Sequence, residues 1–196
     1  KSTNLMLIIN IPIILFGIVY AKQIIGIVAG GGYEGAIVPF QITMVLMLLV
    51  GYDQIQVIQV LMPMKDDKAI LTNSFVGAII GILANFLLVP YCFSTGSALV
   101  LVISELAVLI TARIFVKRHM DIKFPFRLFC REFIFHIPLL IVLILINYIL
   151  NFEYLAFAIS AIITCLYVFL LQYSILKNEL IVGIVYAVLK RKNGVF

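Results

Sequence analysis

Residues 133–150 read FIFHIPLLIVLILINYIL and contain no aspartate, glutamate, lysine or arginine. A helix of about 20 such residues crosses the hydrocarbon core of a bilayer. Only the linker 151–154 (NFEY) separates this run from a second apolar run at 155–176. Because so short a linker permits only a tight reversal, the sequence predicts an antiparallel pair of membrane-spanning helices.

The composition of the whole chain agrees with this class of protein. Of its 196 residues 64% are hydrophobic and 12% are charged, and the mean hydropathy is +1.22. A soluble domain keeps roughly a quarter of its residues charged. The cysteines have neither an even count nor the spacing of metal ligands, which favours free thiols over a disulfide framework or a zinc site. The expected fold is therefore an all-α integral membrane protein.

The apolar runs divide the chain into six predicted transmembrane helices within one domain, 1–196. Their approximate ranges are 4–20, 36–62, 69–89, 98–116, 133–150 and 155–176. A shorter apolar segment at 179–190 ends in a basic cluster and is predicted to lie as a helix in the headgroup region. The chain starts at Lys1 rather than at methionine, and we expect it to be a fragment that lacks an N-terminal part.

The basic residues predict the orientation. If both ends of the chain are cytoplasmic, every one of the 14 lysines and arginines except Lys22 lies on the cytoplasmic side. This strong bias follows the positive-inside rule. The basic residues occur in short clusters between apolar runs, so the positive net charge indicates topology rather than a nucleic-acid partner.

Polar residues within the second span are the first candidates for function. Asp53, Gln56 and Gln59 fall within one sector of a helix, at 100° per residue. Asp53 lies about 10 residues, or roughly 15 Å, from the cytoplasmic end and cannot easily reach the surface. We expect Asp53 to face a hydrated cavity. The two glutamines fit such a cavity and interhelical hydrogen bonding equally well.

The next two spans add one more carboxylate. Glu105 lies near the middle of the fourth span, about 12 Å along the axis from Arg113, which is too far for a direct ion pair. Asn85 is predicted to hydrogen-bond to another helix. Gly77 and Gly81 have the spacing that allows close helix packing. The fifth and sixth spans contain few polar residues and are predicted to be peripheral and to face lipid.

No pattern in the sequence indicates an enzyme. Neither His119 nor His136 has a carboxylate or a cysteine nucleophile at a useful spacing. The motif GGGYEG, which starts at Gly30, lacks the lysine and the strand-to-helix context of a phosphate-binding loop. We therefore expect no catalytic site, metal or cofactor.

Two stretches resemble bacterial polysaccharide flippases. The run LFGIVYAKQIIGIVAGGGYEGAIVPFQI (15–42) is similar to a span and loop that carry a Gly-Tyr element in those proteins, here Gly32 and Tyr33 followed by Ala36. The run NFLLVPYCFSTGSALVLVISE (85–105) is similar to a second motif of the family. The matching residues of that motif are Asn85, Pro90, Gly96, Ser97, Ala98, Ser104 and Glu105.

This resemblance is to the Wzx group of the multidrug/oligosaccharidyl-lipid/polysaccharide (MOP) exporter superfamily. It implies a transporter of 12 to 14 helices in two lobes, of which this chain is the C-terminal lobe. Such proteins flip undecaprenyl-diphosphate-linked oligosaccharide units across the bacterial inner membrane in polysaccharide (O-antigen) biosynthesis. The partners implied are that lipid-linked substrate, membrane lipids and the missing N-terminal lobe.

One departure concerns charge, because cavities in this family usually hold several basic residues for the diphosphate. Here Lys22 is the only basic residue away from the cytoplasmic side. Either the missing lobe supplies the others or the diphosphate assignment is wrong. The predicted cavity residues are Asp53, Gln56, Gln59, Glu105 and Lys22.

Three functions remain open at this stage. The first is a flippase of lipid-linked oligosaccharides that works by alternating access. The second is a multidrug or cation antiporter of the same superfamily, in which Asp53 and Glu105 govern a tighter cavity. The third is a membrane scaffold without transport, in which the polar residues only join helices.

Overall fold

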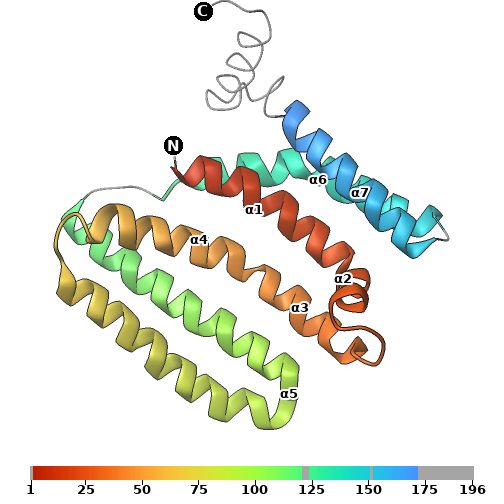
Figure 1. Ribbon diagram of the computed structural model, residues 1–196. Coiled ribbons are helices and arrows are strands. Elements are labelled where there is room, and N and C mark those ends of the chain that lie inside the picture. The colour runs from red at the N-terminus through yellow and green to blue at the C-terminus, as the bar shows by residue number, and fades with distance from the viewer. Residues whose placement is uncertain (1, 121–123, 151, 172–196) are drawn as a thin grey trace, which may run out of the picture.

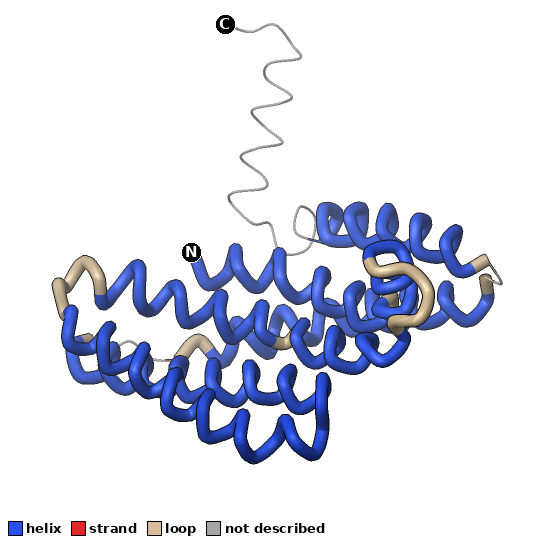
Figure 2. Tube along the Cα trace, turned by 60° about the horizontal axis from the view of Figure 1, so that its bottom comes forward, coloured by secondary structure: helices blue, strands red, loops and turns tan. Residues whose placement is uncertain are grey.

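The computed structural model describes residues 2–120, 124–150 and 152–171, and every regular element in these ranges is a helix (Figure 1). Figure 2 shows the same helices from a second direction, joined by short loops. In chain order the elements are α1 (Ser2–Val19), α2 (Ala21–Val28), η1 (Glu34–Ala36), α3 (Ile37–Met44), α4 (Leu46–Gln56), η2 (Val57–Leu61), α5 (Asp67–His119), α6 (Phe126–Ile149) and α7 (Glu153–Leu170).

Five helical segments of the described chain are long and apolar enough to cross a membrane. They are Ser2–Val19, Glu34–Leu61, Asp67–His119, Phe126–Ile149 and Glu153–Leu170. The all-helical architecture is therefore confirmed, and it is compatible with a multi-pass membrane protein. The predicted interfacial helix at 179–190 and the end of the sixth predicted span lie outside the described residues.

Helix α5 is a hairpin of two antiparallel arms rather than one straight rod. Its 53 residues would extend about 80 Å, far more than one bilayer. The direction reverses at Phe93, whose φ of 47° and ψ of −125° are non-helical. Figure 1 shows the two arms side by side, from yellow to green. The break at Phe93 falls between the third and fourth predicted spans, 69–89 and 98–116.

Small residues allow the arms of α5 to approach closely. A Cβ atom on Gly77 would lie 2.5 Å from a methyl group of Val108, and one on Gly96 would lie 2.6 Å from the carbonyl oxygen of Leu88. A larger residue at Gly96 would therefore collide with backbone, and one at Gly77 would require the Val108 side chain to shift. At the open end of the hairpin, His119 Nε2 lies 2.6 Å from Asp66 Oδ2.

Helix α1 lies between two groups of helices. It contacts α3 and α4 on one side and α6 and α7 on the other, while α3 and α4 pack against α5 (Figure 1). The α4–α5 loop lies at one end of the bundle, and the α2–α3 loop and the start of α7 lie at the opposite end. Within the described residues the two groups meet mainly through α1 and α2, and Tyr52 of α4 also packs against Phe129 of α6 with ring centroids 5.6 Å apart.

Large apolar side chains cover the outside of the bundle. Tyr148 is 86% exposed, Tyr91 is 81% exposed and Phe86 is 76% exposed. The buried core is thin by comparison, and one of its clusters consists of Tyr20, Leu139, Leu143 and Ala156. A soluble protein rarely leaves so large an apolar surface open to water. Contact with lipid explains this surface.

The α6–α7 pair is less peripheral than its sequence suggests. One face of the pair packs against α1, and there Glu132, His136 and Ser160 are fully buried. Tyr20, which lies between α1 and α2, makes a hydrogen bond to Ser160 across this interface. The prediction that these two spans only face lipid is wrong for this face, because α1 supplies polar partners that the two runs lack by themselves.

Candidate functional site

Three polar side chains are buried together where α4 meets the first arm of α5. Asp53 is 4% exposed, Gln56 is 3% exposed and Asn73 is 4% exposed. The Asn73 amide donates a hydrogen bond to the Asp53 carboxylate. We refer to Asp53, Gln56 and Asn73 as the α4–α5 polar cluster.

The position of the cluster follows from the local helix geometry. Asp53 and Gln56 are three residues apart in α4 and therefore share one face. The loop between α4 and α5 reverses the chain, so Asn73 returns to the same depth as Asp53. Both residues lie within long apolar helices, where a polar group has no access to water.

Gln59 does not join this cluster, because it is exposed. The α-helix changes at Val57 into a π-helix, with a hydrogen bond from Met62 N to Val57 O of 2.9 Å. A π-helix has more residues per turn than an α-helix, so the angular spacing that predicted a common face holds only as far as Gln56. Gln59 therefore points away from Asp53.

Four polar atoms of the cluster are buried without a hydrogen-bond partner among the described residues. They are Asp53 Oδ1, Asn73 Oδ1 and both side-chain polar atoms of Gln56. Burying such an atom without a partner costs about 1–3 kcal/mol. Buried unpaired polar atoms are rare in folded proteins and mark a functional group or a bound water or ion. The cluster can hold a proton or a cation at its carboxylate.

Glu105 approaches the cluster from the second arm of α5. It is partly buried, and its carboxylate interacts electrostatically with that of Asp53. Of the predicted site residues, Asp53 and Gln56 are thus buried together on α4, and Glu105 on α5 is near enough to Asp53 for an electrostatic interaction. Two carboxylates in one apolar region repel each other when both are charged, which favours uptake of a positive charge.

Lys22 lies in a different part of the molecule. Its Nζ atom is 2.6 Å from Glu153 Oε1, and this ion pair joins α2 to the start of α7. The hydrogen bond to Glu153 raises the pKa of Lys22 above its ordinary value. Lys22 is therefore already neutralised by a carboxylate, and the five predicted cavity residues do not form a single site.

The sequence contains a signal that places Asn73 near Asp53. Asp53 and Asn73 stand at similar distances on either side of the loop between α4 and α5. Residues at matching distances from a hairpin loop come to the same depth in a pair of antiparallel helices. In contrast, the partners of Tyr20 and Gln23 come from α6 and α7, more than 100 residues later in the chain, and no local pattern identifies them.

The described residues include no group of three or more His, Cys, Asp or Glu side chains that could hold a metal ion. No protein-family model, no curated protein and no solved structure matches this chain. The evidence on the function of the site therefore comes from its geometry and from the motifs in the sequence.

Proposed function

We propose that this chain is one lobe of a membrane transporter that flips undecaprenyl-diphosphate-linked oligosaccharide units across the bacterial cytoplasmic membrane. The observation that carries the proposal is the α4–α5 polar cluster, with four unpaired polar atoms inside an apolar helical bundle. A scaffold would be more stable with apolar side chains at these positions. A transporter needs such groups to bind what it moves or what drives it.

In this proposal Asp53 couples transport to an ion. The carboxylate takes up a proton or a cation in one state of the transporter and releases it in the other. Asn73 holds the carboxylate in place through its hydrogen bond, and Gln56 offers both a donor and an acceptor beside it. The mechanism is alternating access of two lobes around this region, without covalent chemistry.

Asn85 supports the presence of a second lobe. Its side chain is exposed on α5 between apolar residues, and it makes no hydrogen bond within the described part of the chain. The sequence predicted a hydrogen bond from Asn85 to another helix, and the described helices do not provide it. An amide on an outer helix face is costly in lipid, so this face fits contact with a polar surface of the missing lobe.

The proposed arrangement in the membrane has six spans with both ends in the cytoplasm. The two arms of α5 count as separate spans, since they are antiparallel and joined at Phe93. With this arrangement the loops at the α4–α5 end of the bundle are cytoplasmic. The Lys22–Glu153 pair and the α2–α3 loop then face the outside.

The substitution Asp53→Asn in the full-length protein tests the coupling role. It keeps size and hydrogen bonding but removes the charge, so expression should stay normal. Transport should fall roughly tenfold or more, which corresponds to a loss of about 1.4 kcal/mol of coupling. Surface polymer in a strain that depends on this flippase is the readout. Gln54→Leu changes an exposed neighbour in the same helix and should leave polymer unchanged. Normal polymer in Asp53→Asn at normal expression contradicts the proposal.

The electrostatic interaction between Asp53 and Glu105 favours one second candidate, a drug or cation antiporter of the same superfamily. In that case Asp53→Asn should abolish drug resistance or cation efflux and leave surface polymer unchanged. Measuring both readouts in the same strain separates the two transporters.

A further inference from the structure

A small pocket lies at the end of the bundle opposite the α4–α5 loop. Its volume is about 200 Å³, and it is formed by α2, the glycine-rich loop, η1, the start of α3 and the start of α7. Its polar lining residues are Lys22, Gln23, Glu34, Glu153 and Tyr154. We call this space the Gln23 pocket.

Gln23 provides the buried polar group of the pocket. Its side chain is only 5% exposed, and its amide nitrogen donates a hydrogen bond of 3.3 Å to Asn147 Oδ1. This bond fixes the orientation of the amide, so that Oε1 remains without a partner among the described residues. Gln23 thus contributes a fixed polar side chain to the pocket wall, with Oε1 buried behind the surface.

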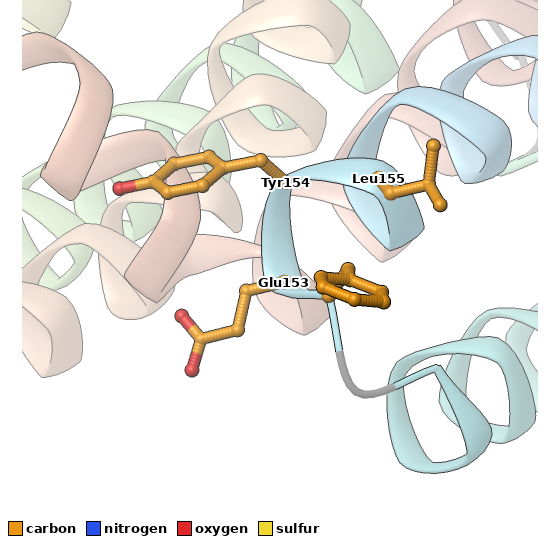
Figure 3. A pocket seen from close by; sticks show the side chains of 4 residues that line it. Glu153, Tyr154 and Leu155 are labelled. Carbon is orange, nitrogen blue, oxygen red and sulfur yellow. The ribbon is translucent and has the colours of Figure 1, made fainter.

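The start of α7 forms the opposite wall. Figure 3 shows the side chains of Glu153 and Tyr154 on one side of this helix start and Leu155 on the other. The tyrosine hydroxyl lies close to Gly26 of α2, 3.5 Å from where a Cβ atom would be. Gly30 has a φ of 83°, a left-handed conformation that favours glycine and turns the loop over the pocket. Phe152–Leu155 also border a larger hollow of about 630 Å³.

The charges of the pocket select against an anion. Lys22 is paired with Glu153 at 2.6 Å, and Glu34 adds a second carboxylate. The three side chains together carry one net negative charge, from two carboxylates and one ammonium. Phosphate groups carry negative charge and offer mainly acceptors. The pocket instead presents two carboxylates as acceptors, and these suit a ligand that is rich in hydrogen-bond donors.

We infer that the Gln23 pocket binds the hydroxyl groups of a single sugar ring. Its volume is below the range of about 300–1,000 Å³ typical of sites for drug-sized ligands, which fits one ring rather than a whole oligosaccharide. The Tyr154 ring adds an apolar surface of the kind that sugar rings contact. This inference rests on the proposed function, since it gives one residue of the transported oligosaccharide a place at the outer face. Lys22 then acts as part of the pocket wall and not as a ligand for the diphosphate.

The test is binding of free monosaccharides to the purified chain in detergent, measured by saturation-transfer difference NMR. The probes are D-glucose, D-galactose and N-acetylglucosamine, with inorganic pyrophosphate as competitor. At least one sugar should bind, and pyrophosphate should not displace it. Glu34→Ala should weaken binding roughly tenfold, the loss expected from one hydrogen bond to a charged group.

Asp67→Ala is the matched control, since it removes an exposed carboxylate at the opposite end of the bundle and should leave binding unchanged. Glu34 is itself exposed, so its substitution tests the pocket without a risk to folding. Binding that persists in Glu34→Ala, displacement by pyrophosphate, or no binding by any of the three sugars overturns the inference.

The result can be separated from a failure of the proposed function. Asp53→Asn should not change sugar binding, because the α4–α5 polar cluster is remote from the pocket. If Asp53→Asn lowers surface polymer and no sugar binds, only the pocket assignment fails. If a sugar binds as expected and Asp53→Asn leaves polymer normal, only the coupling role fails.

Discussion

Two interfaces of this bundle bury polar side chains, and they differ in how those side chains are satisfied. Between α1, α6 and α7, Tyr20 hydrogen-bonds to Ser160, and Tyr167 donates to the carbonyl of Phe135. In the α4–α5 polar cluster only the bond between Asp53 and Asn73 is made, and four polar atoms are left over.

In the first interface the polar side chains hold helices together through hydrogen bonds. In the α4–α5 polar cluster the unpaired atoms are free to bind a ligand. Unpaired atoms on side chains that make another hydrogen bond occur at both interfaces, His136 Nε2 and Arg131 Nε at one and Asp53 Oδ1 at the other, so the contrast rests on Gln56. Gln56 has no bond on either of its polar atoms. Composition does not reveal this distinction, since both interfaces use ordinary polar residues inside apolar helices.

The largest effect should come from breaking the ion pair at the α1–α6–α7 interface. Arg131 Nη2 lies 2.7 Å from Glu132 Oε1 and also donates to Asn4 Oδ1, while Glu132 is fully buried. Arg131→Met removes the guanidinium from a buried carboxylate and should destabilise the fold by about 3 kcal/mol. Thermal unfolding in detergent measures this loss. Arg127→Met, one turn earlier and exposed, is the control and should unfold like the parent.

Tyr20→Phe should give a smaller loss of the same kind. It removes the hydroxyl that meets Ser160 and leaves that fully buried serine without this partner. The expected cost is about 1–2 kcal/mol, with sugar binding at the Gln23 pocket preserved. Tyr148→Phe removes a hydroxyl that is exposed and should leave the free energy of unfolding unchanged. Equal stability of the two variants would contradict a structural role for the Tyr20–Ser160 contact.

Gln56→Leu should raise the stability of the fold, whereas the two substitutions above lower it. Neither polar atom of Gln56 has a partner, so an apolar side chain of similar size removes a desolvation cost and should stabilise the fold by about 1 kcal/mol. Transport by the full-length protein should nevertheless fall, because the cluster loses a donor and an acceptor. A destabilised protein with normal transport would show that Gln56 is structural, and the contrast between the two interfaces would then disappear.

The smallest effect is expected when the pH is varied, because the Lys22–Glu153 pair should keep its contribution to stability over a wide pH range. The hydrogen bond raises the pKa of Lys22 above 10.5, so its stabilising contribution is complete below that value and is lost only as pH rises through the higher folded value. Stability and sugar binding should therefore not depend on Lys22 between about pH 6 and pH 9. The free energy of unfolding of the parent and of Lys22→Met should differ by the same amount throughout this range. A difference that changes with pH in this range would contradict the ion pair between Lys22 and Glu153.

Much of the fold could be predicted because apolar runs and short linkers are local features. The linker at 151–154 predicts the α6–α7 hairpin, and Pro90 with the small polar residues that follow predicts the reversal found at Phe93. The shared face of Asp53 and Gln56 also follows from helix geometry alone. Gln59 could not be placed, because a π-helix arises from backbone hydrogen bonds that no residue type specifies.

The Gln23 pocket was beyond prediction for a different reason. It depends on Asn147 of α6 and on Glu153 and Tyr154 of α7, which meet α2 only in the folded chain. The charge pattern predicted Lys22 to be the only basic residue away from the cytoplasmic side, but its pairing with Glu153 spans 131 positions. A contact over such a distance leaves no periodic signal in the sequence.

The α5 hairpin is closed at both of its ends. Gly96 at its tip would place a Cβ atom 2.6 Å from the carbonyl oxygen of Leu88, so no other residue fits there without forcing the arms apart. At its base the Asp66–His119 contact joins the two free ends. Because the arms are joined at the tip and at the base, we expect them to move together as one unit. A displacement of the hairpin would then shift Asn73 on the first arm and Glu105 on the second at the same time.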